Sequence, residues 1–136
     1  ATGDLPLLPQ RVEAWLETQR PALPAPAARL VDGIGLRLEA LAPQLVGLDP
    51  QQPAAAEVRK LLCDELPELV KGYARVPEAL RRQDRDGLSP DRQLLDGLKV
   101  VDDQLTRMTA DLARRTHVLE RGARLHIVQS QSRGRR

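Results

Sequence analysis

The chain has 136 residues, of which 41% are hydrophobic, 29% charged and 1% aromatic, and its net charge is +2. This length suits one domain with a hydrophobic core, and no apolar run approaches the ~20 residues that cross a bilayer. The single cysteine excludes an internal disulfide framework and a cysteine-based zinc site. Because the sequence starts with Ala1 rather than Met, we expect it to be part of a longer protein.

Prolines divide the first part of the chain. Residues 1–9 and 21–26 predict an extended tail and a linker, because a residue before proline avoids the helical region. Between them, Pro9 to Arg20 predicts a short helix. The apolar residues on one side of this helix are Val12, Trp15 and Leu16.

A second helix is predicted from about Ala27 to Leu48, with bends favoured by two glycines and by Pro43. Its apolar residues at helical spacing are Leu30, Ile34, Leu38, Leu41, Leu45 and Leu48. A third helix is predicted from about Pro53 to Tyr73, with a kink near Cys63 caused by Pro67. Its apolar stripe is Val58, Leu62, Leu66, Leu69 and Tyr73, and we expect the Cys63 thiol to be buried beside it.

A short helical turn at Pro77 to Gln83 and a polar loop from Gln83 to Gly87 lead to the last helix. Ser89 suits the cap of that helix, because a serine oxygen accepts from the free amides of the first turn. The helix is predicted from Pro90 to about Gln129, roughly 60 Å long and longer than its partners. Its coiled-coil-like seam is Leu94, Leu98, Val101, Leu105, Met108 and Leu112, continued after a one-residue shift by Thr116, Leu119, Ala123 and Ile127.

No segment alternates with the period of two that a half-buried strand requires. The predicted fold is therefore all-α, an antiparallel helical bundle of three main helices plus a short N-terminal helix. We expect residues 1–26 to form a tail, short helix and linker, residues 27–129 to form the bundle domain, and residues 130–136 to form a basic tail.

The charge of the chain is unevenly distributed. Residues 112–136 carry a net charge of +6, and the first 111 residues carry −4. A basic terminal segment binds phosphates of nucleic acid or of acidic lipid, or pairs with acidic protein surfaces. The candidate anion-binding residues are Arg114, Arg115, Arg121, Arg124, Arg133, Arg135 and Arg136.

Three other motifs lack the neighbouring residues or the spacing that a functional site of their kind requires. The loop at Asp84 has Arg82 and Gln93 where a calcium loop needs carboxylates. The two histidines are nine residues apart and lack the i, i+4 spacing of a helical zinc site. Asp102 and Asp103 are adjacent in a predicted helix and so point about 100° apart, which does not suit an acid/base pair. We therefore predict no catalytic, cofactor-binding or metal-binding residues and no cofactor.

A longer pattern covers residues 61–129. Leu62-Cys63-Asp64-Glu65-Leu66-Pro67-Glu68-Leu69, then Tyr73 and Val76-Pro77, precede the helix start Ser89-Pro90-Asp91-Arg92-Gln93-Leu94-Leu95. This pattern resembles the helical C-terminal region of the bacterial 5-bromo-4-chloroindolyl phosphate hydrolysis (XpaC-like) proteins. The resemblance implies a bacterial origin and a helical fold, and it carries over no catalytic residue.

These observations favour a non-enzymatic interaction or scaffold domain of a larger bacterial protein. The long last helix predicts a protein partner or a homo-oligomer. The alternative function is an anion-binding module for nucleic acid or an anionic membrane surface, and a phosphoester hydrolase ranks last. We expect a cytoplasmic location, with any membrane association arising from another part of the protein.

Overall fold

A computed structural model of the chain describes residues 2–83 and 88–134, with side chains described for residues 4–83 and 88–115. All regular elements in these ranges are helical, which confirms the predicted all-α fold. The elements are η1 (Thr2–Leu7), α1 (Leu8–Gln19), η2 (Arg20–Ala22), α2 (Ala25–Leu45), α3 (Pro53–Arg59), η3 (Lys60–Glu65), α4 (Leu66–Arg75), η4 (Glu78–Leu80) and α5 (Pro90–Gly134).

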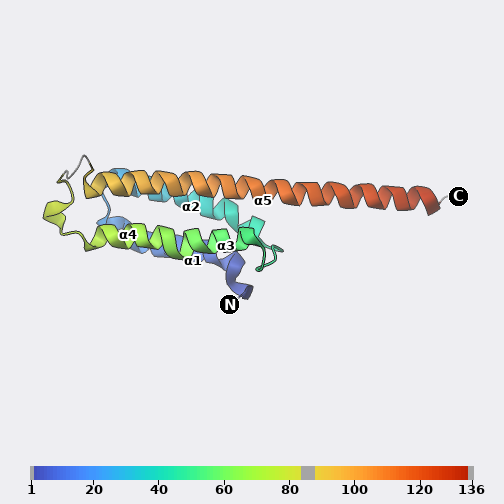
Figure 1. Cartoon of the computed structure of the whole chain (residues 1–136), viewed down its shortest axis with the longest axis horizontal. Helices are drawn as coiled ribbons and strands as arrows, with labels where there is room; N and C mark the ends of the chain where they lie inside the picture. Colours follow the sequence, from blue (N-terminus) through green and yellow to red (C-terminus); the bar gives the residue numbers. More distant parts are fainter. Residues whose placement is uncertain (1, 84–87, 135–136) are drawn as a thin grey trace.

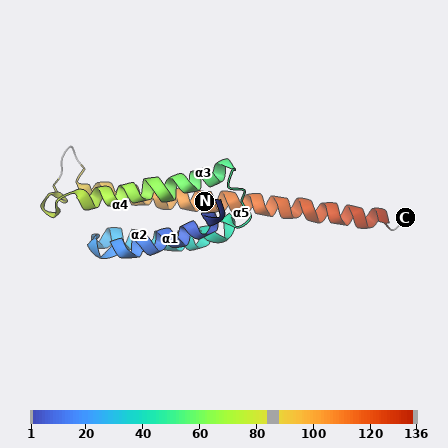
Figure 2. The same cartoon turned by 90° about the horizontal axis from the view of Figure 1, so that it is seen from below.

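The helices form a bundle of two hairpins packed side by side (Figures 1 and 2). α1 and α2 make one antiparallel hairpin, and the continuous rod of α3, η3 and α4 makes the other with α5. α2 packs most extensively against α5, and these two helices run in the same direction. The predicted bundle is thus confirmed, with a parallel α2–α5 contact between its two antiparallel pairs.

The hydrophobic core runs along the centre of this bundle. On α2, the predicted stripe is buried at Ile34, Leu38, Leu41 and Leu45. The helix ends at Leu45 rather than at Leu48, because Val46 is extended and Gly47 adopts a φ of 83°. Glycine reaches this left-handed region without the steric cost that a Cβ brings.

The N-terminal segment differs from its prediction as an extended tail. Residues Thr2–Leu7 form a 3₁₀ helix that contains Pro6, and Leu5 is buried in the same hydrophobic cluster as α1 and α2. The predicted linker is shorter as well, since α2 already begins at Ala25. A proline in the first turn of a helix loses no hydrogen bond, so Pro26 begins the helix instead of breaking it.

The expected irregularity near Cys63 takes the form of a π-helical segment, η3. The backbone N–H of Leu66 donates to the carbonyl of Leu61, five residues back. Pro67 has no N–H to donate and its ring would collide with the carbonyl four residues earlier in an α-helix. The wider π turn precedes this proline, so that the helix continues to Arg75. Cys63 is exposed in this segment, and the expectation of a buried thiol is wrong.

The junction between α4 and α5 is held by side chains from both helices. The Tyr73 hydroxyl donates a 2.6 Å hydrogen bond to Oδ1 of Asp91, and the Arg81 guanidinium lies 4.7 Å from the centre of the Tyr73 ring. The Ser89 hydroxyl accepts from the backbone N–H of Arg92 at 3.2 Å, which confirms the predicted cap. Residues 84–87, most of the predicted polar loop, lie outside the described residues.

α5 is much longer than its neighbours. It has 45 residues against 21 in α2, which corresponds to roughly 68 Å against 32 Å at 1.5 Å per residue. Its seam is buried as predicted at Leu94, Leu98, Val101, Leu105 and Leu112, with Met108 partly buried. Beyond the bundle the helix projects alone (Figure 1). The predicted continuation at Thr116, Leu119, Ala123 and Ile127 falls where side chains are not described.

Candidate functional site

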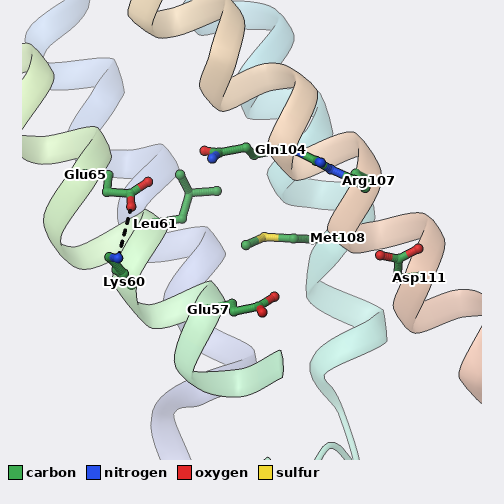
Figure 3. Close-up of a pocket in the computed structure, with 8 residues that line it drawn as sticks. All are labelled: Glu57, Lys60, Leu61, Glu65, Gln104, Arg107, Met108 and Asp111. Carbon is green, nitrogen blue, oxygen red and sulfur yellow. Dashed lines mark ion pairs between the residues drawn. The ribbon is translucent and has the colours of Figure 1, made fainter. Parts of the chain in front are cut away.

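A groove lies between the α3–η3 rod and α5, near the end of the bundle from which α5 projects (Figure 3). Its cavity volume is about 320 Å³. The residues that line it are Glu57, Lys60, Leu61, Glu65, Gln104, Arg107, Met108 and Asp111. We call it the α3–α5 groove.

The α3–α5 groove has charged walls around an apolar centre. Met108 reaches across from α5 toward Leu61 on η3 (Figure 3). Lys60 and Glu65 form an ion pair at 3.9 Å on the rim of the η3 wall. The Glu57 carboxylate, in contrast, has no ion pair or hydrogen bond with any described residue. The groove therefore offers an unpaired carboxylate beside the partly buried Met108 and the buried Leu61.

Gln104 supplies a second polar group without a hydrogen-bond partner. Its Oε1 atom is buried and accepts no hydrogen bond within the described part of the chain. A buried acceptor without a donor costs about 1–3 kcal/mol, so a ligand with an N–H group at this point gains a hydrogen bond. In Figure 3 the Gln104 side chain extends from α5 toward the η3 side of the groove.

A smaller hollow of about 50 Å³ adjoins the α3–α5 groove. It shares Glu57, Met108 and Asp111 with the groove and adds Ala54, Val58, Leu112 and Arg115. From Gln104 to Arg115, α5 rises by roughly 16 Å. The groove and the hollow together therefore follow α5 to the point where it leaves the bundle.

Two of the predicted anion-binding residues have described side chains. Arg114 is exposed and pairs with Asp111 one turn earlier, and exposed Arg115 lines the smaller hollow. Arg121, Arg124 and Arg133 lie on α5 without described side chains, and Arg135 and Arg136 lie outside the described residues. The structure thus places the start of the basic segment beside the groove.

Sequence reasoning missed Glu57, Gln104 and Arg107 as site residues. Each is a single polar residue on a helix, with no spacing that singles it out. They meet only because α3 packs antiparallel to α5 at one particular register. Asp102, which does not suit an acid/base pair with Asp103, forms a 3.3 Å ion pair with Arg37 of α2.

A second cluster of charge lies between α1 and α2. Glu13, Glu17, Asp32 and Glu39 line a hollow of about 90 Å³, where Asp32 is paired with Arg20 at 2.8 Å. Burial, and then the neighbouring Glu39 and Glu17 carboxyls, raise the pKa of Glu13 above its ordinary value. No group of three or more His, Cys, Asp or Glu side chains in the described ranges has an arrangement that could hold a metal ion.

Comparison with models of protein families, with curated proteins and with solved structures finds no match for this chain. The resemblance to the XpaC-like proteins stays a prediction. Among the described residues, no helix has both the length and the apolar character that a membrane span requires.

Proposed function

We propose that this chain is a non-enzymatic helical interaction or scaffold domain of a larger bacterial protein, and that it binds its partner through the part of α5 beyond the bundle. The observation that carries the proposal is the length of α5. Its seam is buried against the other helices at positions up to Leu112, the last seam residue with a described side chain, and the helix continues to Gly134. We call residues 116–134 the α5 arm.

A helix without tertiary contacts is weakly stable in water. Nucleation is unfavourable, and single helices of up to about 15 residues are marginal even with favourable sequences. The α5 arm is only slightly longer, and its sequence continues the apolar spacing of the seam at Leu119, Ala123 and Ile127. A partner that packs along these positions supplies the burial that the bundle supplies to the first half of α5.

Site-specific photo-crosslinking tests this function. A benzophenone amino acid replaces Leu119 or Ile127 in the full-length protein in its source cells, and a control variant carries it at Asp103, which is exposed on the bundle. We expect protein adducts from positions 119 and 127 and none from position 103. Absence of adducts at both arm positions, or equal adducts at position 103, overturns the proposal.

Anion binding is the second candidate, and the charge distribution favours it. Residues 112–136 carry seven arginines and one acid. Binding to phosphates releases counterions and so falls steeply with salt. The test compares the whole chain with a variant lacking residues 130–136, using duplex DNA and phosphatidylserine vesicles at rising salt. Salt-dependent binding that the deletion weakens supports this candidate, and binding that the deletion leaves unchanged rejects it.

A further inference from the structure

We propose that the α3–α5 groove binds a small zwitterionic peptide, with the ligand's ammonium at Glu57 and its carboxylate at Arg107. This inference goes beyond the proposed function, because it uses none of the residues of the α5 arm. The two side chains line opposite walls of the groove, Glu57 on α3 and Arg107 on α5 (Figure 3). The cavity volume of about 320 Å³ lies at the lower end of the range for small-molecule sites, roughly 300–1,000 Å³, and so suits a ligand of dipeptide size.

The pairing of the charged side chains in the groove selects these two. Three acids and two bases line it. Lys60 pairs with Glu65 at 3.9 Å, and Asp111 pairs with Arg114 on its own helix. The lining acid and base that remain, one on each wall, form no ion pair with each other or with any other described side chain. A ligand that carries both charges satisfies both of them, whereas a simple cation or anion leaves one of them unpaired.

Gln104 favours a peptide over other zwitterions. Its Oε1 atom is buried on the same wall as Arg107 and accepts no hydrogen bond within the described part of the chain. Gln104 precedes Arg107 by three residues, a rise of about 4.5 Å along α5 at 1.5 Å per residue. In a peptide, only one carbon atom separates the last N–H group from the terminal carboxylate carbon. A carboxylate at Arg107 therefore brings an N–H donor close to the level of Gln104.

The centre of the groove favours an apolar side chain on this peptide. The Met108 side chain extends from α5 toward the buried Leu61 and is itself partly buried (Figure 3). A thioether is polarizable and adapts to an apolar neighbour, so a leucine side chain packed over Met108 removes more apolar surface from water. Glycyl-leucine therefore carries all the groups that match the groove: an ammonium, a peptide N–H, a carboxylate and an apolar side chain.

The single methionine gives a direct probe of the groove. Met108 is the only methionine of the chain, so an isotope label in the methionine methyl group gives a single resonance. Titration of the whole chain with glycyl-leucine at constant ionic strength follows this resonance. We expect it to shift and to saturate as one site fills. Two blocked peptides should bind about fivefold more weakly: N-acetyl-glycyl-leucine lacks the ammonium, and glycyl-leucinamide lacks the carboxylate.

Two neutral variants assign the two ends of the ligand. Glu57→Gln should raise the Kd of glycyl-leucine by about fivefold and leave that of N-acetyl-glycyl-leucine unchanged, because the acetylated peptide has no ammonium to lose a partner. Arg107→Gln should raise the Kd of glycyl-leucine equally and leave that of glycyl-leucinamide unchanged. The matched controls Glu68→Gln and Arg92→Gln neutralise exposed side chains outside the groove, and we expect them to change none of these Kd values.

Gln104→Leu tests the part played by the peptide N–H. It should raise the Kd of glycyl-leucine by about fivefold. It should leave the Kd of ω-aminopentanoate unchanged, because this zwitterion has the same number of atoms between its charges and no N–H group between them. Equal weakening of the two ligands overturns the choice of a peptide.

The remaining outcomes decide the site itself. Circular dichroism establishes that all variants keep their helix content. A Met108 resonance that none of the ligands shifts, or blocked peptides that bind as tightly as glycyl-leucine, overturns the proposal. So does a control variant that weakens binding as much as Glu57→Gln or Arg107→Gln, or a neutral variant that weakens glycyl-leucine and its matching blocked peptide alike.

Discussion

Gly97 on α5 lies directly against Leu69 on α4. A Cβ atom at Gly97 would come within 2.6 Å of Leu69 Cδ1 and 2.8 Å of Cδ2, closer than real Cβ contacts allow. The missing side chain thus lets the two helices of the second hairpin approach each other.

Replacing Gly97 by alanine tests this close approach. Alanine favours a helix over glycine by about 1 kcal/mol, so the new contact with Leu69 must outweigh this gain to destabilise the protein. We expect Gly97→Ala to lower the free energy of unfolding by about 1 kcal/mol in urea denaturation. In a Leu69→Ala background the same change becomes stabilising, because the obstructing methyl groups are gone.

Gly33 provides the matched control for that substitution. It lies inside α2, and a Cβ there meets nothing within 4 Å. Gly33→Ala therefore raises the free energy of unfolding by about 1 kcal/mol through helix propensity alone. Equal effects of alanine at the two glycines would contradict the close contact assigned to Gly97.

Tyr73 couples the stability of the α4–α5 junction to alkaline pH. Burial, and then the hydrogen bond to Asp91, raise the pKa of its hydroxyl from 10.0 to about 12. Because the folded state holds this proton more tightly, the stabilisation is complete below pH 10 and is lost as pH rises toward 12. We expect Tyr73→Phe to cost about 1–2 kcal/mol at neutral pH and to flatten the stability loss between these pH values.

Urea unfolding of Tyr73→Phe and the parent chain at neutral pH and between pH 10 and 12 measures both effects. Arg81 contacts the same ring, and its guanidinium opposes the rise in the Tyr73 pKa. An alkaline stability profile that Tyr73→Phe leaves unchanged would show that the hydroxyl plays no part in it.

Glu13 affects how the stability of the protein changes with pH in the acidic range. Its pKa is raised by burial and by the Glu39 and Glu17 carboxyls, so the folded state binds this proton more tightly than the unfolded chain does. The resulting stabilisation is present below the ordinary pKa of 4.5 and is lost as pH rises through the raised value. Glu13→Gln should therefore be more stable than the parent at pH 7 and lose less stability between pH 4 and 7.

Thermal unfolding across this pH range measures the Glu13 effect. Glu68→Gln serves as the control, because Glu68 is an exposed carboxyl on α4 away from the acidic cluster. If Glu13→Gln and Glu68→Gln change the melting temperature alike at every pH, the shared carboxyl cluster between α1 and α2 does not control stability.

The start of α5 depends on one side-chain hydrogen bond. The Ser89 hydroxyl accepts from the N–H of Arg92, an amide that has no partner within the helix. Ser89→Ala should lower the free energy of unfolding by about 1 kcal/mol. Ser89→Asp should keep most of the stability of the parent chain, because its carboxylate can also cap the helix. Chemical denaturation of the two variants compares them, and equal losses in both would argue against capping at this position.

Local patterns predicted much of this fold, because helical periodicity and capping are encoded within a few residues. The seam on α5 from Leu94 to Leu112 and the cap at Ser89 were both predicted from such spacing and are confirmed. Pro67 correctly marked an irregular turn. Local spacing did not predict that this turn is π-helical or that both Leu61 and Leu62 are buried in it.

The candidate site could not be predicted from local sequence patterns. Glu57 and Asp111 are 54 positions apart, and only the antiparallel register of α3 and α5 brings them to one groove. The parallel contact of α2 with α5 is likewise a property of the whole bundle. The N-terminal segment was predicted as a tail because its prolines break α-helices, whereas a 3₁₀ turn accommodates Pro6 and buries Leu5.

Amide hydrogen exchange along α5 tests most directly whether its C-terminal part is a binding segment. The amides from Leu94 to Leu112 belong to the bundle and serve as an internal reference for stable helix. Binding predicts that residues 116–134 exchange within seconds in dilute purified protein and become protected when concentration rises or cell extract is added. Fast exchange of these residues under all three conditions would contradict the account.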